Sequence, residues 1–184
     1  MKIISGGQTG VDRAALDVAL KHGIECGGWC PVGRLDEFGT IPERYPVKEL
    51  TRDDKEGRPP LARRSDAEAA DRPGGLETAA PSEKQDRFAA RTYANVRDSD
   101  GTLIIYFEEL SGGTEFTSEC CEQLHRPPQL IDAGKVSVDN AASAIGDFVR
   151  QYKIGVLNIA GPRQSEWPGG YGYAFRALEI FVAS

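Results

Sequence analysis

Residues 2–18, KIISGGQTGVDRAALDV, combine a short apolar strand, a turn with few side chains and the first turns of a helix. Residues 2–4 form the strand, and the glycines between residues 5 and 10 end it. From Val11 on, apolar side chains recur at helical spacing, and Thr9 with Asp12 has the spacing of a capping pair. Backbone N–H groups are exposed where a strand meets the amino end of a helix. The stretch therefore predicts a binding site for an anion or a polar ligand.

This turn differs from two common nucleotide-binding patterns. It lacks the Gly-Lys-Ser/Thr ending of the phosphate-binding loop, and its glycines do not complete a Gly-x-Gly-x-x-Gly dinucleotide fingerprint. ATP hydrolysis by a phosphate-loop mechanism is therefore not expected.

Length and composition bound the class of protein. A chain of 184 residues, 40% of them hydrophobic, is expected to form a single domain over residues 1–184. The formal charge is -6 without a basic run, which disfavours nucleic-acid binding. With no signal peptide and no apolar run of membrane-spanning length, we expect a soluble cytoplasmic protein. The four cysteines form no pair of CxxC motifs, so no metal site is expected.

Two more turns of the same kind follow apolar strands. Residues 101–107, GTLIIYF, form the strongest predicted strand, and the sequence SGGT at residues 111–114 then opens a helix. Residues 154–160 form another buried strand, and GPR at residues 161–163 precedes the last helix. The other expected elements are strands at 24–30 and 129–132 and helices at 86–96, 138–150 and 171–182.

Two segments do not fit this alternation. Residues 31–50 contain three prolines and no periodicity, which predicts a long loop of the kind that serves as a lid or binding loop. Residues 51–85 contain four prolines and fifteen charged residues, which predicts a charged surface insertion.

The order of the remaining elements predicts the fold. Strands that alternate with helices favour an α/β fold, in which helices cover both faces of a parallel sheet and form a three-layer sandwich. In such sheets, ligands bind beyond the carboxyl ends of the strands, where the strand order reverses. The three glycine turns are therefore expected to meet at that edge.

The turns and the long loop contain residue types that bind a phosphorylated ligand. Backbone amides, polar side chains and guanidinium groups hold anions, whereas a carboxylate accepts the adjacent N–H donors of a pterin or guanine ring. The candidates for phosphate are Gly6, Gly7, Gln8, Thr9, Gly10, Gly112, Gly113, Thr114 and Gly161, with the arginines Arg13, Arg34, Arg44 and Arg163. The candidates for the ring are Asp12, Glu115 and Glu119, and the residues themselves do not choose among these acids.

Several motifs together resemble the molybdenum cofactor carrier family. They are SGGQTGVDRAALD, GGWCPVGR, IPERYP, NVRDSDGTLI, SGGT and NIAGPR, and they cover nearly the whole chain apart from residues 51–85. The resemblance implies a Rossmann-like fold, in a superfamily that includes the lonely-guy-type phosphoribohydrolases and DNA-processing protein A. It also implies a homo-oligomer and molybdenum cofactor (molybdopterin) as cargo.

One comparison within this superfamily concerns catalysis. The phosphoribohydrolases carry a Gly-Gly-x-Gly-Thr-x-x-Glu motif, and Gly112, Gly113 and Glu119 fall at matching places. Glu115 and Phe116 replace the third glycine and the threonine, and a carboxylate and a bulky ring would repel or crowd a phosphate. The resemblance thus puts hydrolase activity in doubt.

Three hypotheses for the function follow. The first is a non-enzymatic binding or carrier protein for a small phosphorylated heterocycle, either molybdenum cofactor or a nucleotide. The second is a nucleotide N-glycosidic hydrolase with Glu119 as its catalytic residue. The third is a nucleotide-sensing module that contacts a protein partner through residues 51–85.

Overall fold

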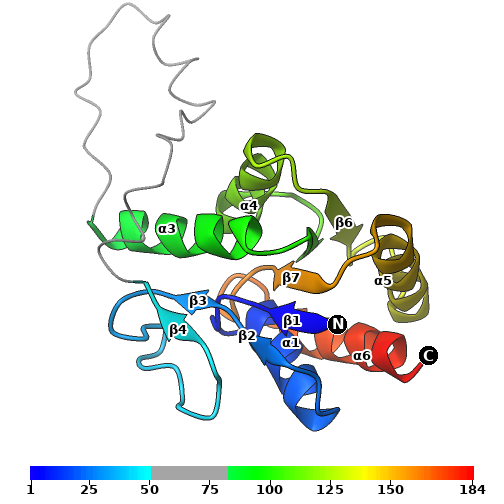
Figure 1. The fold of residues 1–184 in the computed structure, drawn as a ribbon, viewed down its shortest axis with the longest axis horizontal. Coiled ribbons are helices and arrows are strands. Elements are labelled where there is room, and N and C mark those ends of the chain that lie inside the picture. Colours follow the sequence, from blue (N-terminus) through cyan, green and yellow to red (C-terminus); the bar gives the residue numbers. More distant parts are fainter. Residues whose placement is uncertain (51–82) are drawn as a thin grey trace, which may run out of the picture.

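The computed structural model describes residues 1–50 and 83–184, and Figure 1 labels their helices and strands. In chain order, the elements are β1 (Lys2–Ile4), α1 (Val11–Lys21), β2 (Cys26–Gly27), β3 (Trp29–Cys30), β4 (Lys48–Glu49), α3 (Glu83–Arg97), β5 (Gly101–Tyr106), α4 (Gly112–Gln123), β6 (Pro128–Asp132), α5 (Val138–Tyr152), β7 (Val156–Ala160) and α6 (Gly170–Ala183).

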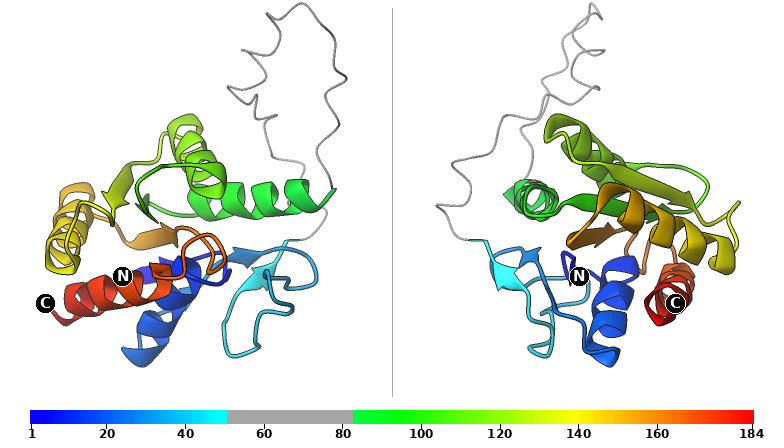
Figure 2. Two further views of the ribbon diagram at one scale, coloured as in Figure 1. Left: turned by 180° about the vertical axis from the view of Figure 1, so that it is seen from behind. Right: turned by 45° about the vertical axis from the view of Figure 1, so that its right-hand side comes forward.

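Five strands form one parallel sheet in the order β2-β1-β7-β5-β6. Helices α1, α5 and α6 pack together on one face of this sheet, and α3 and α4 pack together on the other (Figures 1 and 2). The α/β three-layer sandwich that the sequence predicts is thus confirmed.

The strand order reverses between β1 and β5. After β1 the chain passes through α1 to β2 on one side, whereas after β5 it passes through α4 to β6 on the opposite side. Strand β7 lies between them. The turns after β1, β7 and β5 therefore emerge side by side at the carboxyl edge of the sheet, which is where ligands bind in folds of this class.

Apolar side chains on both faces of the central strands hold the layers together. Leu103, Ile105, Leu157 and Ile159 are fully buried in the main core, and Ile104 is fully buried as well. Strands this apolar are typical of parallel sheets covered on both sides. Each such side chain stabilises the fold by about 1.5–3 kcal/mol through burial.

Residues 24–30 do not form one continuous strand. Strand β2 joins the main sheet, whereas β3 pairs with β4 in a second, two-stranded sheet, so the predicted loop at 31–50 ends in a strand. The break falls at Gly28, where φ is 126° and a Cβ atom would lie 2.1 Å from the carbonyl oxygen of Ser5. Glycine is therefore required for the chain to pass so close to the end of β1.

Two predicted boundaries need correction. Helix α1 follows Gly10 and has no side-chain cap, so the predicted capping pair of Thr9 and Asp12 is wrong. Helix α3 begins at Glu83, so residues 83–85 belong to a helix and not to the predicted insertion. The rest of that insertion, residues 51–82, lies outside the described residues. The elements from β5 onward that the sequence predicts with both bounds lie within two residues of those bounds.

Candidate functional site

The three glycine turns meet at one cleft at the carboxyl edge of the sheet. The turn after β1 contributes Gly6 and Gln8, the turn after β7 contributes Gly161 and Arg163, and the amino end of α4 contributes Gly113 and Thr114. The cleft holds about 540 Å³ between atoms, including its mouth, which is open to solvent. Its other lining residues are Asp12, Arg91, Thr92, Asn95, Thr117, Asn158, Ile159, Ala160 and Glu166.

A buried ion pair lies in the wall of this cleft. Nη1 of Arg91 donates to Oδ2 of Asp12 at 2.9 Å, and only 15% and 4% of the two side chains are exposed. The same Asp12 oxygen accepts the backbone N–H of Gln8 at 3.3 Å. A Cβ atom at Gly6 would lie 1.4 Å from Nη1 of Arg91, so the missing side chain of Gly6 makes room for the pair.

Burial and the ion pair shift the pKa of the Asp12 carboxyl in opposite directions. Loss of solvation raises the pKa of this carboxyl, while the Arg91 guanidinium lowers it; burial has the larger effect and the pKa is raised. Perturbed carboxyl groups in clefts are typical of functional sites, although structural ion pairs are perturbed as well.

Gln8 presents an amide group to the cleft. Its side-chain oxygen accepts the backbone N–H groups of Thr9, at 3.0 Å, and of Glu37, at 2.9 Å. The residue is only 5% exposed, and no atom within residues 1–50 and 83–184 accepts a hydrogen bond from its Nε2. Because Nε2 makes no hydrogen bond to these residues, it is available to donate to a ligand acceptor.

The amino end of α4 borders open space. Ser111 is its N-cap, and in the capping box the Thr114 hydroxyl accepts the backbone N–H of Ser111 at 3.3 Å; the same hydroxyl donates to the Ser111 carbonyl at 2.7 Å. Thr114 is thus the third residue of the helix and not its N-cap. No protein atom lies within 4 Å of a Cβ built at Gly113, which lines the cleft. The partial positive charge of a helix amino end favours an anion at such a position.

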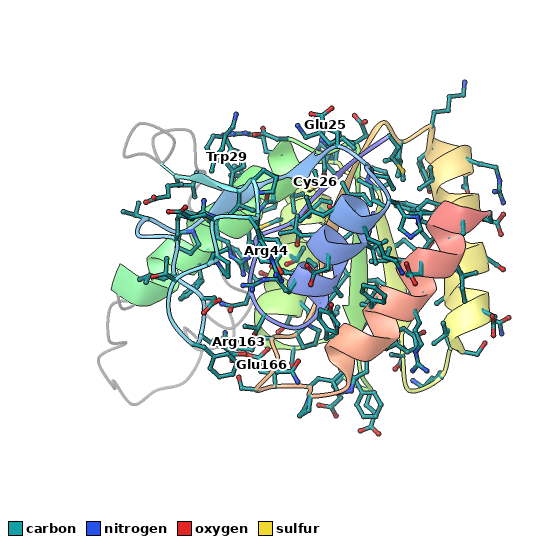
Figure 3. All side chains as sticks on the ribbon, turned by 90° about the horizontal axis from the view of Figure 1, so that it is seen from below. Glu25, Cys26, Trp29, Arg44, Arg163 and Glu166 are labelled. Atoms are coloured by element: carbon teal, nitrogen blue, oxygen red, sulfur yellow. The ribbon has the colours of Figure 1, made fainter. Side chains whose placement is uncertain are left out.

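Arg163 and Glu166 also line the cleft, from the loop between β7 and α6 (Figure 3). Arg163 Nε lies 2.9 Å from Glu166 Oε1, and both side chains are substantially exposed. Gly161 supports this loop, because a Cβ atom there would lie 2.6 Å from Cβ of Val11 and 2.7 Å from the carbonyl oxygen of Ile105.

Some predicted ligand residues have structural roles instead of lining the cleft. The φ angles of Gly7 and Gly10 are 70° and 74°, which favour glycine. A Cβ atom at Gly7 would meet Ile41 at 3.2 Å, and one at Gly10 would meet the Pro162 carbonyl oxygen at 2.4 Å. The Thr9 hydroxyl donates to Glu37. The predicted residues that do not line the cleft are Gly7, Thr9, Gly10, Arg13, Arg34, Arg44, Gly112, Glu115 and Glu119.

Three of the four predicted arginines serve the 31–50 segment and its contacts with α1. Arg34 donates to the carbonyl oxygens of Val47 at 2.7 Å and Tyr45 at 3.0 Å. Arg13 pairs with Asp36 at 2.9 Å. Arg44, which Figure 3 shows apart from Arg163, contacts the Tyr45 hydroxyl and lies 3.5 Å from Asp17. Only Arg163 of the four lines the cleft.

The cleft also contains residues that the glycine-turn motifs do not include. Arg91, Thr92 and Asn95 come from α3, and Thr117 comes from α4. Asn158 is a polar residue within the buried strand β7, and its Nδ2 donates to Thr102 at 3.2 Å. A polar residue inside an apolar strand is a sequence signal that could have identified this position.

Comparison with known proteins assigns the chain to a protein family. A sequence model of the family described as the circularly permutated YpsA SLOG family matches residues 3–71 and 77–182. The chain belongs to this family. The resemblance stated from the motifs is also confirmed by a solved structure, named "Putative molybdenum carrier protein", from Syntrophus aciditrophicus SB. It is 40% identical, with a TM-score of 0.76 over 98% of this chain and 94% of that one.

A search among curated proteins found no match. The YpsA SLOG family match and the solved structure together support the Rossmann-like α/β fold and a ligand-binding role. Within residues 1–50 and 83–184, no helix is long and apolar enough to cross a membrane. No cluster of three or more His, Cys, Asp or Glu side chains that could hold a metal ion is found in that same part of the chain.

Proposed function

We propose that this chain binds a small phosphorylated heterocycle in the cleft and acts as a carrier, with molybdenum cofactor or a nucleotide as cargo. The observation that carries the proposal is the meeting of three glycine turns at one polar cleft beyond the strand ends, as ligand sites in such sheets require. The name of the solved structure from Syntrophus aciditrophicus favours the molybdenum cofactor as the first cargo to test.

The phosphate of the ligand is assigned to the amino end of α4. Gly113 offers a backbone surface without a side chain there, and the helix end contributes a favourable partial charge. Arg163 lines the same cleft. Its ion pair with Glu166 is exposed, so exchanging Glu166 for a ligand phosphate costs little.

The ring is assigned to the neutral and acidic groups of the cleft. A pterin or guanine ring has both donors and acceptors along one edge, and the free Nε2 of Gln8 supplies a donor. Of the three acids proposed from the sequence, only Asp12 lines the cleft, whereas Glu115 and Glu119 do not. Asp12 is therefore the only one of these three acids that remains a candidate at the cleft.

The hydrolase alternative has less support than binding alone. Thr117 faces the cleft, and Glu119 lies two residues further along α4, about 200° around the helix axis. Glu119 therefore points away from the space where a nucleotide would react. Self-association, cytoplasmic location and a partner for residues 51–85 stay predictions.

The test is to identify the ligand that purifies with the protein. Mass spectrometry of the extracted ligand is expected to give a pterin or a nucleotide. Gly113→Leu should remove this ligand without unfolding the protein, because its side chain would enter open space in the cleft. Gly172→Leu is the matched control, since Gly172 is also in the first turn of a helix, has nothing within 4 Å of its Cβ position and does not line the cleft.

Two outcomes would overturn the proposal. The first is a Gly113→Leu protein that keeps its ligand, which would place the site elsewhere. The second is the release of free base from nucleoside monophosphates by the wild-type protein, abolished by Glu119→Gln, which would establish the hydrolase instead.

A further inference from the structure

The Arg91 guanidinium is only partly used by the protein. Its Nη1 is paired with Asp12, but Nε is buried without a hydrogen-bond partner among the described residues. Within the same described residues, no hydrogen bond involves Nη2 either. Nε and Nη2 form one edge of the guanidinium, the fork that binds two oxygens of one anion. Among the described residues, both donors of this edge are therefore unpaired in a residue that lines the cleft, and Nε is itself buried from solvent.

Three contacts fix the position of this guanidinium. Asp12 holds Nη1, Gly6 leaves the space that Nη1 occupies, and the ring of Phe88 lies with its centroid 5.9 Å from Cζ of Arg91. One helical turn later, Asn95 accepts from Trp29 N at 2.8 Å and donates to Trp29 O at 3.0 Å. These two hydrogen bonds attach α3 to β3, so the fork is held in place before any ligand arrives.

We infer that Arg91 is the residue through which the cleft recognises a tetrahedral oxyanion, and that Asp12 is its positioning residue. The inference rests on the proposed function for the location of the site. It adds the residue whose guanidinium binds the anionic group of the ligand. The chemistry fits a phosphoryl group on an organic ligand and also a free oxyanion such as molybdate. A neutral heterocycle alone would leave the fork unfilled, and such unpaired buried donors are costly.

Asp12 has a different role from the one assigned by sequence. Oδ2 already accepts two hydrogen bonds, from Arg91 and from Gln8 N, and the residue is only 3% exposed. Its main contribution is to hold the guanidinium in place and to balance its charge. A ligand oxyanion then completes the donors of Arg91 without displacing Asp12, because it uses the other edge.

The test uses orthophosphate and, separately, molybdate as probes. Each is titrated into the full-length protein while the Nε–H resonance of Arg91 and the amide resonances of Gln8 and Gly113 are followed by NMR. The Arg91 signal is assigned by its loss in Arg91→Met. We expect a saturable shift of this signal with at least one probe, and the comparison of the two shows whether phosphoryl groups or molybdate are preferred.

The double variant Arg91→Met with Asp12→Asn guards against misfolding, because it removes both buried charges together. It is expected to bind the effective probe at least about tenfold more weakly, since charge-assisted hydrogen bonds are lost. Arg176→Met is the matched control, an arginine on α6 that does not line the cleft.

The results separate this inference from the proposed function. If the Arg91 signal does not move with either probe, or if the double variant binds as the wild type does, the inference is wrong. If the Gln8 and Gly113 resonances shift while the Arg91 resonance does not, the cleft binds anions but Arg91 does not bind them. If Arg91 responds but no heterocycle purifies with the protein, the inference stands and the proposed cargo fails.

Discussion

Gly6 and Arg91 are complementary in shape, because the Nη1 atom of Arg91 lies 1.4 Å from where a Cβ atom of Gly6 would be. We predict that Gly6→Ala displaces the guanidinium from Asp12 while leaving every charge in place. Forcing an extra carbon into this packing should destabilise the fold by about 1–3 kcal/mol. Urea unfolding measures this loss, and an orthophosphate titration should show weaker binding. An alanine variant with unchanged stability and binding would mean that Arg91 moves freely at this position.

Removing one charge of the Arg91–Asp12 pair should lower the free energy of unfolding strongly. Arg91→Met leaves a buried carboxylate without its partner, and removing one member of a buried pair costs about 3–5 kcal/mol. The added variant Asp12→Asn removes that isolated charge, so the double variant should recover much of the stability. A double-mutant cycle by urea unfolding measures the coupling, and additive effects of the two substitutions would contradict it.

The sequence predicts the scaffold of this site better than its chemistry. The glycine turns were recognisable because each follows an apolar strand, and parallel strands bring such turns to one edge. Arg91 was missed because its partner Asp12 is 79 residues away in the chain, a pairing that local periodicity does not reveal. The helix predicted at 86–96 did place Arg91 and Asn95 one turn apart, which was the available signal.

The arginines of the long loop show the opposite error. Arg34 looked like an anion-binding residue, yet a loop with little regular structure has carbonyl groups that need donors, and Arg34 supplies them. Sequence shows which residues carry charge, but not whether the backbone of their own loop uses that charge. This is why Arg163, in a shorter loop beside the sheet, lines the cleft and Arg34 does not.

Alanine substitution at two glycines of the cleft should change the stability of the fold in opposite directions. Gly161→Ala would place a Cβ atom 2.6 Å from Val11, which should destabilise the fold by about 1–3 kcal/mol. Gly113→Ala meets no protein atom and lies in a helix, so it should stabilise the fold by up to about 1 kcal/mol. Thermal unfolding compares the two variants. Destabilisation by Gly113→Ala would show that this position is packed rather than open to the cleft.

Glu37 links the turn after β1 to the turn after β7, and this link should depend on pH. Its carboxylate accepts hydrogen bonds from the Thr9 hydroxyl and from the hydroxyl and backbone N–H of Ser165. Burial raises the pKa of Glu37, but the hydrogen bonds from Ser165 and Thr9 outweigh it and hold the pKa below its ordinary value of 4.5. A carboxyl with a lowered pKa contributes stability that is present above about pH 4.5 and is lost as the pH falls through its folded pKa.

Glu37→Gln tests this link without changing the size of the side chain. At neutral pH the variant should be less stable than the wild type by less than about 1 kcal/mol, because the group is only partly buried. As the pH falls below about 4.5, the wild type should lose this advantage and the two unfolding free energies should converge. Urea unfolding of both proteins across this range measures the difference. If the gap between them stays constant through the acid range, the carboxylate of Glu37 does not join the two turns.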